Sequence, residues 1–262
     1  TNCPAGWKVS GSKINATKGS YAFITNPIIK IYGIPILWLP YIAIPIKNER
    51  QSGFLAPGFG VHEDHGFTFT ESFFWAINRS TDMTITGTNY AQRGLKGGLE
   101  YRYVADQKSS GIFRGFFLND KKFGKDRKYT NPDTAYNLEP REPVSAVARF
   151  GVIYGHRFEL PNGYTNTAQI KLVRDSFYVN DFPDDIGSKG DPALDNRFTL
   201  TRNTENSHSS LDTSLYQDLL KADPMGDNRY AIHRVPSVNY SVFLPKISGT
   251  NLLSKVDFQY LN

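Results

Sequence analysis

The segment IIKIYGIPILWLPYIAIPIKNERQSGFLAP, residues 28–57, decides between the fold classes open to this chain. It is strongly apolar, yet proline recurs through it, and proline removes a backbone donor and breaks helices. The prolines in or just before the apolar part are Pro27, Pro35, Pro40 and Pro45. A membrane-spanning helix needs about 20 apolar residues with paired backbone groups. The segment therefore predicts short apolar strands with forced bends, followed by a polar hinge at residues 47–53.

Beyond the hinge, aromatic and polar side chains alternate as they do in strands with one apolar face. In Phe67–Ile77 most odd-numbered positions are large and apolar, whereas Thr68, Thr70 and Ser72 are polar. The same period recurs at 82–90, 99–103, 146–155, 167–173 and 238–260. We expect roughly nine or ten strands after the hinge. Long polar loops are expected at 119–143 and 180–196, and the best helical candidate is Leu215–Ala222.

The composition indicates a β-rich protein of one large domain or two ordinary ones. Of 262 residues, 14% are aromatic, with 18 Phe and 15 Tyr against 2 Met, and aromatic side chains pack well on pleated sheets. The net charge of +5 comes from scattered basic residues, so we expect no nucleic-acid partner. The single cysteine, Cys3, either bonds to a cysteine outside this chain or is a free buried thiol. Because the first residue is Thr, we expect a processed or excised piece.

Strands of about ten residues with one apolar face fit two architectures. One is a soluble β-sandwich with a dry core, which would bind glycans through its Tyr and Trp side chains. The other is an outer-membrane barrel with lipid outside and water inside. Short turns that alternate with long polar loops favour the barrel, as do aromatic residues near the expected strand ends. These aromatic residues are Tyr90, Tyr101, Tyr103, Tyr154 and Tyr240.

Five motifs follow one another in the first part of the chain. They are CPAGWKVSGSKI (3–14), GIPILWLPYIAIPI (33–46), SGFLAPGFG (52–60), FFWAINRSTDMTIT (73–86) and RGLKGGLEYRY (93–103). In order and spacing they resemble the LptD family of outer-membrane lipopolysaccharide-assembly proteins, also called organic solvent tolerance proteins. The segment that contains them, residues 3–103, is a bit more than a third of the chain. Beyond Gly111 the resemblance is limited to strands, loops and an Arg-Val-Pro element at 234–236.

The resemblance implies an all-β fold in two parts. Residues 1–50 would be the last strands of a periplasmic β-jelly roll. Residues 51–262 would be the N-terminal antiparallel strands of a large outer-membrane β-barrel. An unpaired last strand is untenable in lipid, so we expect the natural protein to be longer.

The resemblance also implies a function in the Gram-negative outer membrane, with no cofactor. The protein would insert lipopolysaccharide into the outer leaflet. Acyl chains would pass at the junction of jelly roll and barrel, and sugars would pass through the lumen and a lateral seam. The implied partners are lipopolysaccharide, a plug lipoprotein (LptE-like) and a periplasmic bridge protein (LptA-like).

Several residues take expected roles from the resemblance. Cys3 fits a family cysteine that bonds to one near the far end of the barrel, a partner that this chain does not contain. Some members carry prolines near the positions of Ser72 and Gly87; here Gly87 would weaken strand pairing through missing side-chain packing. The residues expected in the seam strands are Phe67, Phe69, Ser72, Phe73, Trp75 and Gly87.

The apolar block and the hinge are the candidate substrate contacts. A continuous apolar wall would let acyl chains move without crossing water, and ordinary sandwich core is the alternative interpretation. The candidate wall residues are Ile34, Ile36, Trp38, Tyr41, Ile42 and Ile44. The candidate hinge residues are Lys47, Arg50, Ser52 and Gly53. Lys47 and Arg50 would meet substrate phosphates at the membrane surface, unless the hinge is a solvated linker.

No metal site is expected. His62, Glu63, Asp64 and His65 form the densest run of ligand-type residues, but a strand or turn would point them alternately to opposite sides. Four charged residues are expected as salt-bridged side chains of the lumen. They are Arg93, Glu100, Arg102 and Arg149.

No catalytic residues are expected either. The sequence contains no G-x-S-x-G, H-E-x-x-H or phosphate-loop motif. The enzymatic alternative is an outer-membrane barrel lipase with a Ser/His pair, in which His156, His208 or His233 would be the base.

Overall fold

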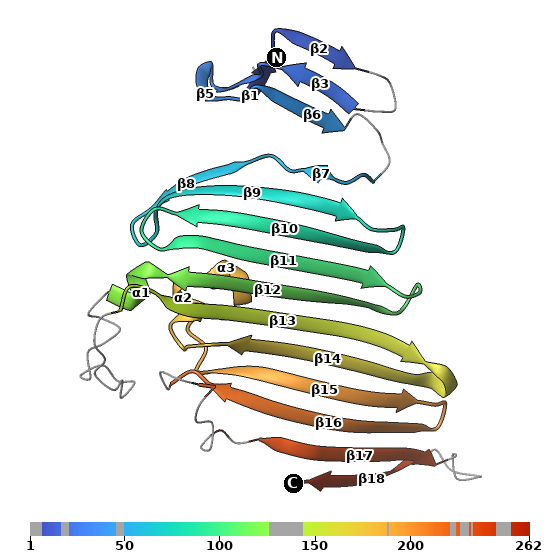
Figure 1. Cartoon of the computed structure of the whole chain (residues 1–262). Coiled ribbons are helices and arrows are strands. Elements are labelled where there is room, and N and C mark those ends of the chain that lie inside the picture. The colour runs from blue at the N-terminus through green and yellow to red at the C-terminus, as the bar shows by residue number, and fades with distance from the viewer. Residues whose placement is uncertain are drawn as a thin grey trace.

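The computed structural model describes most of the chain as antiparallel strands (Figure 1). The described residues are 7–16, 21–45, 50–125, 144–187, 189–220, 224–225, 231, 233–244 and 253–262. The expected all-β fold class is confirmed. Within these residues no helix is both long enough and apolar enough to cross a membrane.

Residues 7–45 form two small three-stranded sheets (Figure 1). One contains, in spatial order, β1 (Trp7–Ser10), β4 (Ile28–Ile31) and β5 (Ile34–Trp38), and the other contains β2 (Lys13–Ala16), β3 (Tyr21–Thr25) and β6 (Tyr41–Pro45). The prolines act as expected: Pro27 precedes β4, Pro40 separates β5 from β6, and Pro35 lies on the edge strand β5, where a missing N–H is tolerated.

Twelve further strands form one antiparallel sheet, in which β9 to β18 lie side by side in chain order (Figure 1). The strands are β7 (Gly53–Phe54), β8 (Gly58–His62), β9 (Gly66–Ala76), β10 (Thr81–Tyr90), β11 (Gly94–Val104), β12 (Ser110–Asp120), β13 (Val147–Leu160), β14 (Tyr164–Val173), β15 (Ala193–Asn203), β16 (Ser207–Asp218), β17 (Arg234–Leu244) and β18 (Ser254–Leu261). The helix expected at Leu215–Ala222 was wrong. Leu215 pairs with Asn196 of β15, because ladder hydrogen bonds outweigh local helix propensity.

The two faces of this large sheet differ in polarity. We call the face that bears Phe73, Ile85 and Leu99 the apolar face, and the opposite face, with Ser72 and Thr86, the polar face. In the described part of the chain no second sheet covers the apolar face (Figure 1). Its exposed side chains include Phe54, Phe67, Trp75, Ile85, Leu95, Phe117, Phe198, Leu215, Tyr240 and Phe258.

The connections between strands also differ at the two ends of the sheet. At one end four of the five connections are short turns, at 77–80, 105–109, 161–163 and 204–206, and the fifth is 245–253. The longest connections, 121–146, 174–192 and 219–233, lie at the other end (left in Figure 1). We call these the short-turn end and the long-loop end. The alternation agrees with the expectation from the sequence.

The connection 174–192 folds back over the polar face. It contains α2 (Tyr178–Asp181) and α3 (Pro183–Ile186), and α1 (Lys121–Lys125) follows β12 nearby (Figure 1). The buried core formed there consists of Leu118, Val173, Tyr178, Val179, Phe182, Ile186, Leu194 and Leu219.

Strands β14 and β15 separate beyond the pair Gln169–Arg197. Side-chain amides replace the missing ladder bonds. The Lys171 N–H donates to Asn196 Oδ1 at 2.7 Å. The Gln217 amide binds both the N–H and the C=O of Val173, at 3.0 and 2.9 Å. The buried backbone is therefore satisfied although the strands part.

Candidate functional site: an interrupted edge strand and a buried ionic cluster

The first edge strand of the large sheet is interrupted. Gly53 and Phe54 of β7 pair with Phe74 and Phe73 of β9, and β8 then pairs over five residues, from Gly58–Thr70 to His62–Gly66. Between them, the Leu55 N–H donates to the Ser72 carbonyl at 2.8 Å. Pro57 has no N–H to offer. The pairing of this edge is therefore weakest at residues 55–57.

The described part of the hinge is bound to its surroundings. The Ser52 hydroxyl oxygen accepts the Ala76 N–H at 2.9 Å, and its carbonyl accepts the Tyr21 hydroxyl at 3.0 Å. Arg50 forms an ion pair with Asp82. Arg50 also donates to the Arg79 carbonyl at 3.2 Å. The hinge is thus fastened to the short-turn end of β9 and β10, not solvated as a free linker. Lys47 lies outside the described residues.

The residues expected in the seam divide between the two faces. Phe67, Phe69, Phe73, Trp75 and Gly87 lie on the apolar face. Phe69 and Phe73 contact aromatic side chains of the edge strand. The Phe69 ring is tilted against Phe59 at 5.3 Å, and the Phe73 ring meets Phe54 edge to face at 5.2 Å. Ser72 lies on the polar face, where its hydroxyl contacts that of Thr86 at 2.9 Å.

The residues expected to line an acyl-chain path lie on β5 and β6. Ile34, Ile36, Trp38 and Tyr41 are exposed, by 43–65%. Ile42 is half-buried and pairs with Ile24 of β3. Whether these side chains line a path for acyl chains or belong to a sandwich core stays a prediction. Cys3 and the side chain of Ile44 fall outside the described residues.

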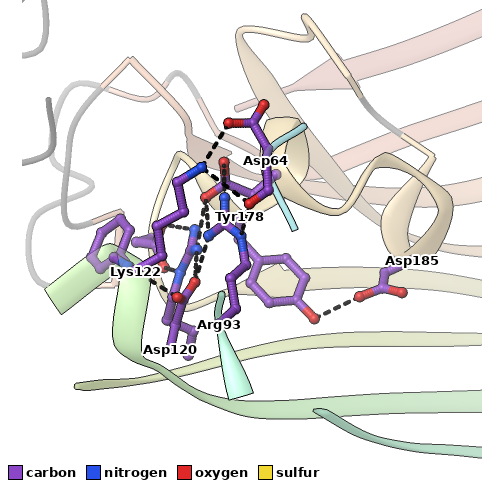
Figure 2. A network of polar contacts seen from close by, with 10 residues as sticks. Asp64, Arg93, Asp120, Lys122, Tyr178 and Asp185 are labelled. Carbon is purple, nitrogen blue, oxygen red and sulfur yellow. Dashed lines mark hydrogen bonds and ion pairs between the residues drawn. The ribbon is translucent and has the colours of Figure 1, made fainter. Parts of the chain in front are cut away.

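A buried ionic cluster joins the polar face to the connection 174–192. Figure 2 shows Arg93 and Asp120 at its centre. Arg93, Asp120 and Arg149 are fully buried. The Asp120 carboxylate accepts from both arginines, at 2.6 and 2.8 Å. Asp181 of α2 binds the same two guanidinium groups, at 3.1 and 2.7 Å. Asp175 closes the cluster with a bidentate pair to Arg149, both bonds at 2.8 Å.

A second pair lies beside this cluster. Lys96 of β11 binds Asp185 of α3 at 2.9 Å. The Tyr178 hydroxyl donates to the same carboxylate at 2.7 Å, as Figure 2 shows. Burial and the Asp185 charge raise the pKa of Tyr178 above its ordinary value. Removing one partner of such a buried pair costs about 3–5 kcal/mol, because the other charge is left uncompensated. The cluster therefore fixes the connection at one position on the sheet.

The cluster also reaches the tip of the interrupted edge strand. Arg93 donates to the Asp64 carbonyl at 3.3 Å, and Lys122 pairs with the Asp64 carboxylate at 2.9 Å (Figure 2). The His65 ring stacks on Phe182 at 5.3 Å. Burial, and next the Arg93 charge, lower the pKa of His65 below 6.5. The β8–β9 turn is thus pinned at the long-loop end.

Four lumen charges were expected from the sequence, and all four lie on the polar face or at its margin in ion pairs. Arg93 and Arg149 belong to the cluster, and Glu100 pairs with Arg114 at 2.6 Å and Arg102 with Asp82 at 2.7 Å. Sequence reasoning missed the carboxylates Asp120, Asp175, Asp181 and Asp185. A signal for the local structure of this segment, though not for its ion pairs, was available: Tyr178, Phe182 and Ile186 recur every four residues, just before and within the expected polar loop 180–196.

The histidines considered for catalysis bind other groups. His156 contacts the Tyr154 hydroxyl at 2.9 Å and the side-chain oxygen Oδ1 of Asn166 at 2.6 Å. His208 contacts Asn203 at 2.5 Å, and His233 accepts the Tyr216 N–H at 3.2 Å. Among the described residues no group of three or more metal-ligand side chains comes together.

A single antiparallel sheet with one uncovered apolar face, one polar face and alternating short and long connections has the pattern of a wall of an outer-membrane β-barrel. The comparison with known families names the kind of protein more narrowly. Residues 23–219 match the family model described as "LptD protein". The chain belongs to the LptD family.

The curated relatives are named "LPS-assembly protein LptD". The protein of Vibrio vulnificus (strain YJ016) is 26% identical over 95% of this chain and 29% of its own length. That of Actinobacillus pleuropneumoniae serotype 5b (strain L20) is 28% identical over 83% of this chain and 26% of its own length. That of Pseudomonas aeruginosa (strain UCBPP-PA14) is 26% identical over 93% of this chain and 24% of its own length. The chain thus spans less than a third of the length of these relatives.

Two glycines of β13 test the packing of the connection 174–192. A Cβ on Gly151 would lie 2.7 Å from Tyr178 and 3.0 Å from Ile186, whereas a Cβ on Gly155 would meet nothing closer than 3.7 Å. We expect Gly151→Val to displace α2 and α3 and to destabilise the protein by about 1–3 kcal/mol. Gly155→Val on the same face is the matched control. Denaturant unfolding and proteolysis within 174–192 measure the effect; equal behaviour of the two variants would contradict this packing.

The lowered pKa of His65 predicts a pH dependence of the same connection. An unfolded histidine titrates near 6.5, so below this pH the unfolded state binds more protons than the folded state. The contribution of neutral His65 to the free energy of unfolding is therefore complete above pH 6.5. It is lost as the pH falls toward the lowered pKa of His65 in the folded state. We expect hydrogen exchange in 174–187, corrected for its intrinsic pH dependence, to accelerate on acidification. His65→Phe should abolish this response, and His208→Phe, the control, should leave it unchanged.

Proposed function

We propose that this chain forms part of an outer-membrane translocon that inserts lipopolysaccharide into the outer leaflet. The observation that carries the proposal is the large sheet with an uncovered apolar face and a polar face. Such a wall separates lipid from an aqueous lumen. Membership of the LptD family and the printed name of the relatives support the same conclusion.

We infer that acyl chains travel along residues of β5 and β6. Ile34, Ile36 and Trp38 alternate along β5 and present apolar surface to their surroundings. Burial of an acyl chain against such a surface gains about 25 cal/mol per Å² of apolar area. The hinge at Arg50–Gly53 leads from these strands to the edge of the large sheet, so the chains would enter the membrane at this junction.

The sugars would take the polar face and leave at the interrupted edge strand. The gap at Leu55–Pro57 supports a lateral seam at this position, because few main-chain bonds must break there. On this proposal residues 1–50 are periplasmic and the short-turn end faces the periplasm. A periplasmic bridge protein (LptA-like) would deliver the substrate to the small sheets, and a plug lipoprotein (LptE-like) would contact the polar face.

The two rival functions have less support in the structure. A soluble glycan-binding sandwich requires the apolar face to pack against a second sheet, and in the described chain this face is exposed. A lipase requires a histidine paired with a serine, and the contacts of His156, His208 and His233 are to other groups.

Photo-crosslinking in living cells tests the function. We expect a photoreactive residue at Ile36 to form adducts with lipopolysaccharide, because its side chain is exposed on the proposed acyl path. A photoreactive residue at Lys13 of β2, which is also exposed but belongs to the other small sheet, is the control. Depletion of the intact protein should also abolish new lipopolysaccharide at the cell surface. Absence of adducts at Ile36 would refute the acyl path.

Adjacent residues of β10 test the orientation of the wall. Ile85 lies on the apolar face and Thr86 on the polar face. We expect Ile85→Arg to lower the folded yield in membranes, since Arg on the lipid face at mid-depth costs about 2–4 kcal/mol. Thr86→Arg should assemble normally. Folding into phospholipid vesicles, followed by heat-dependent gel mobility, measures both; an equal loss in the two variants would contradict the assignment of faces.

A further inference from the structure

Glu71 is a carboxylate on the apolar face of β9. The other side chains of β9 on this face are Phe67, Phe69, Phe73 and Trp75. Glu71 is half-buried and lies at the middle of the strand. Acidic side chains at lipid-facing positions are costly and rare. A specific interaction partner is therefore expected for the Glu71 carboxylate.

Glu71 lies opposite the gap in the edge strand. Phe54 pairs with Phe73 and Gly58 pairs with Thr70, so residues 55–57 face Glu71 and Ser72. The Ser72 N–H, left without a strand partner by the gap, donates to Glu71 Oε1 at 3.2 Å. One carboxylate oxygen therefore takes over a missing ladder bond. A neutral side-chain oxygen could also accept the Ser72 N–H. This hydrogen bond alone therefore does not explain why the residue is a charged carboxylate.

The surroundings of Glu71 leave room for a ligand. On the next strand the residue opposite is Gly87, and beyond it on β11 lies Gly97. A Cβ on either glycine would meet nothing within 4 Å. The carboxylate thus borders a strip of bare backbone, and large apolar side chains such as Phe73, Ile85 and Leu99 lie beside this strip.

The polar face is also suited to sugars at this same point. The hydroxyls of Thr70 and Thr88 lie 3.1 Å apart, and those of Ser72 and Thr86 lie 2.9 Å apart. These hydroxyls line the luminal side of the gap, and Glu71 lies on its membrane side. A polar group that crosses the edge here would meet hydrogen-bonding side chains on both faces.

We propose that Glu71 accepts hydrogen bonds from the sugar hydroxyl and amide N–H groups of lipopolysaccharide where its sugars join its acyl chains, as the molecule leaves through the gap. This inference rests on the proposed function. A carboxylate attracts these donors and repels phosphate. It therefore selects the neutral donor groups of the substrate, while the acyl chains lie along the bare strip at Gly87 and Gly97.

Crosslinking from Gly87 tests the proposal without replacing Glu71. A photoreactive residue at Gly87 is introduced into the intact protein with Glu71, Glu71→Gln or Glu71→Leu. We expect lipopolysaccharide adducts at position 87 when residue 71 is Glu. The Glu71→Gln variant should form fewer, because the Gln side chain still accepts a hydrogen bond through its carbonyl oxygen. With Leu we expect about a tenfold loss, the effect of losing a hydrogen bond to a charged acceptor. A photoreactive residue at Gly97, one strand further from Glu71, should respond less to these substitutions.

Two results would overturn the proposal. Equal adduct yields from position 87 in the protein with Glu71 and in the Glu71→Leu variant would mean that Glu71 only accepts the Ser72 N–H. Adducts at Ile36 together with none at Gly87 would mean that the substrate leaves elsewhere. Crosslinking at Ile36 separates this failure from failure of the proposed function, in which neither position would form adducts.

Discussion

The antiparallel main-chain ladder from β9 to β18 is the constraint on which the rest of this structure depends. Because successive residues point to opposite faces, one register places most large apolar side chains on one side and most charged ones on the other, with Glu71 as an exception on the apolar face. A shift of one residue would exchange them. Where the ladder stops, side chains supply the missing bonds: Asn196 and Gln217 between β14 and β15, and Glu71 opposite the gap in the edge strand.

The buried ionic cluster fixes the position of the connection 174–192 more than it adds to the stability of the fold. Taking Arg93, Arg149 and Asp120 out of water costs several kcal/mol per ion, and their attraction offsets this only when every donor is satisfied. Here one carboxylate is shared by two guanidinium groups and Asp175 binds bidentately. Such geometry is fulfilled in one arrangement only. The connection 174–192 therefore covers a fixed part of the polar face, which an apolar contact of equal strength would specify less sharply.

The alternation in Phe67–Ile77 was sufficient to predict both the strand and its apolar face, since a two-residue period has one structural meaning. The position of Arg149 on the polar face followed in the same way. The carboxylates that pair with the two arginines could not be predicted, because Asp175 lies 26 residues from Arg149 and Asp181 lies 88 residues from Arg93. Charge pairing at that range leaves no periodic signal. Leu215–Ala222 was misassigned because a short amphipathic segment fits a helix and a strand equally until its neighbour is known.

The two halves of the edge strand are held with very different strength. β8 has five paired residues, and its turn is tied to the cluster through Asp64 and His65. β7 has two paired residues and is followed by the gap at Leu55–Pro57. Separation of this edge from β9 is therefore expected to begin at residues 55–57, between β8 and the part of the hinge that Ser52 and Arg50 fasten to β9 and β10. On the proposed path, an amphiphile that arrives along β5 and β6 would reach this gap before β8, because the sequence order is hinge, β7, gap and β8.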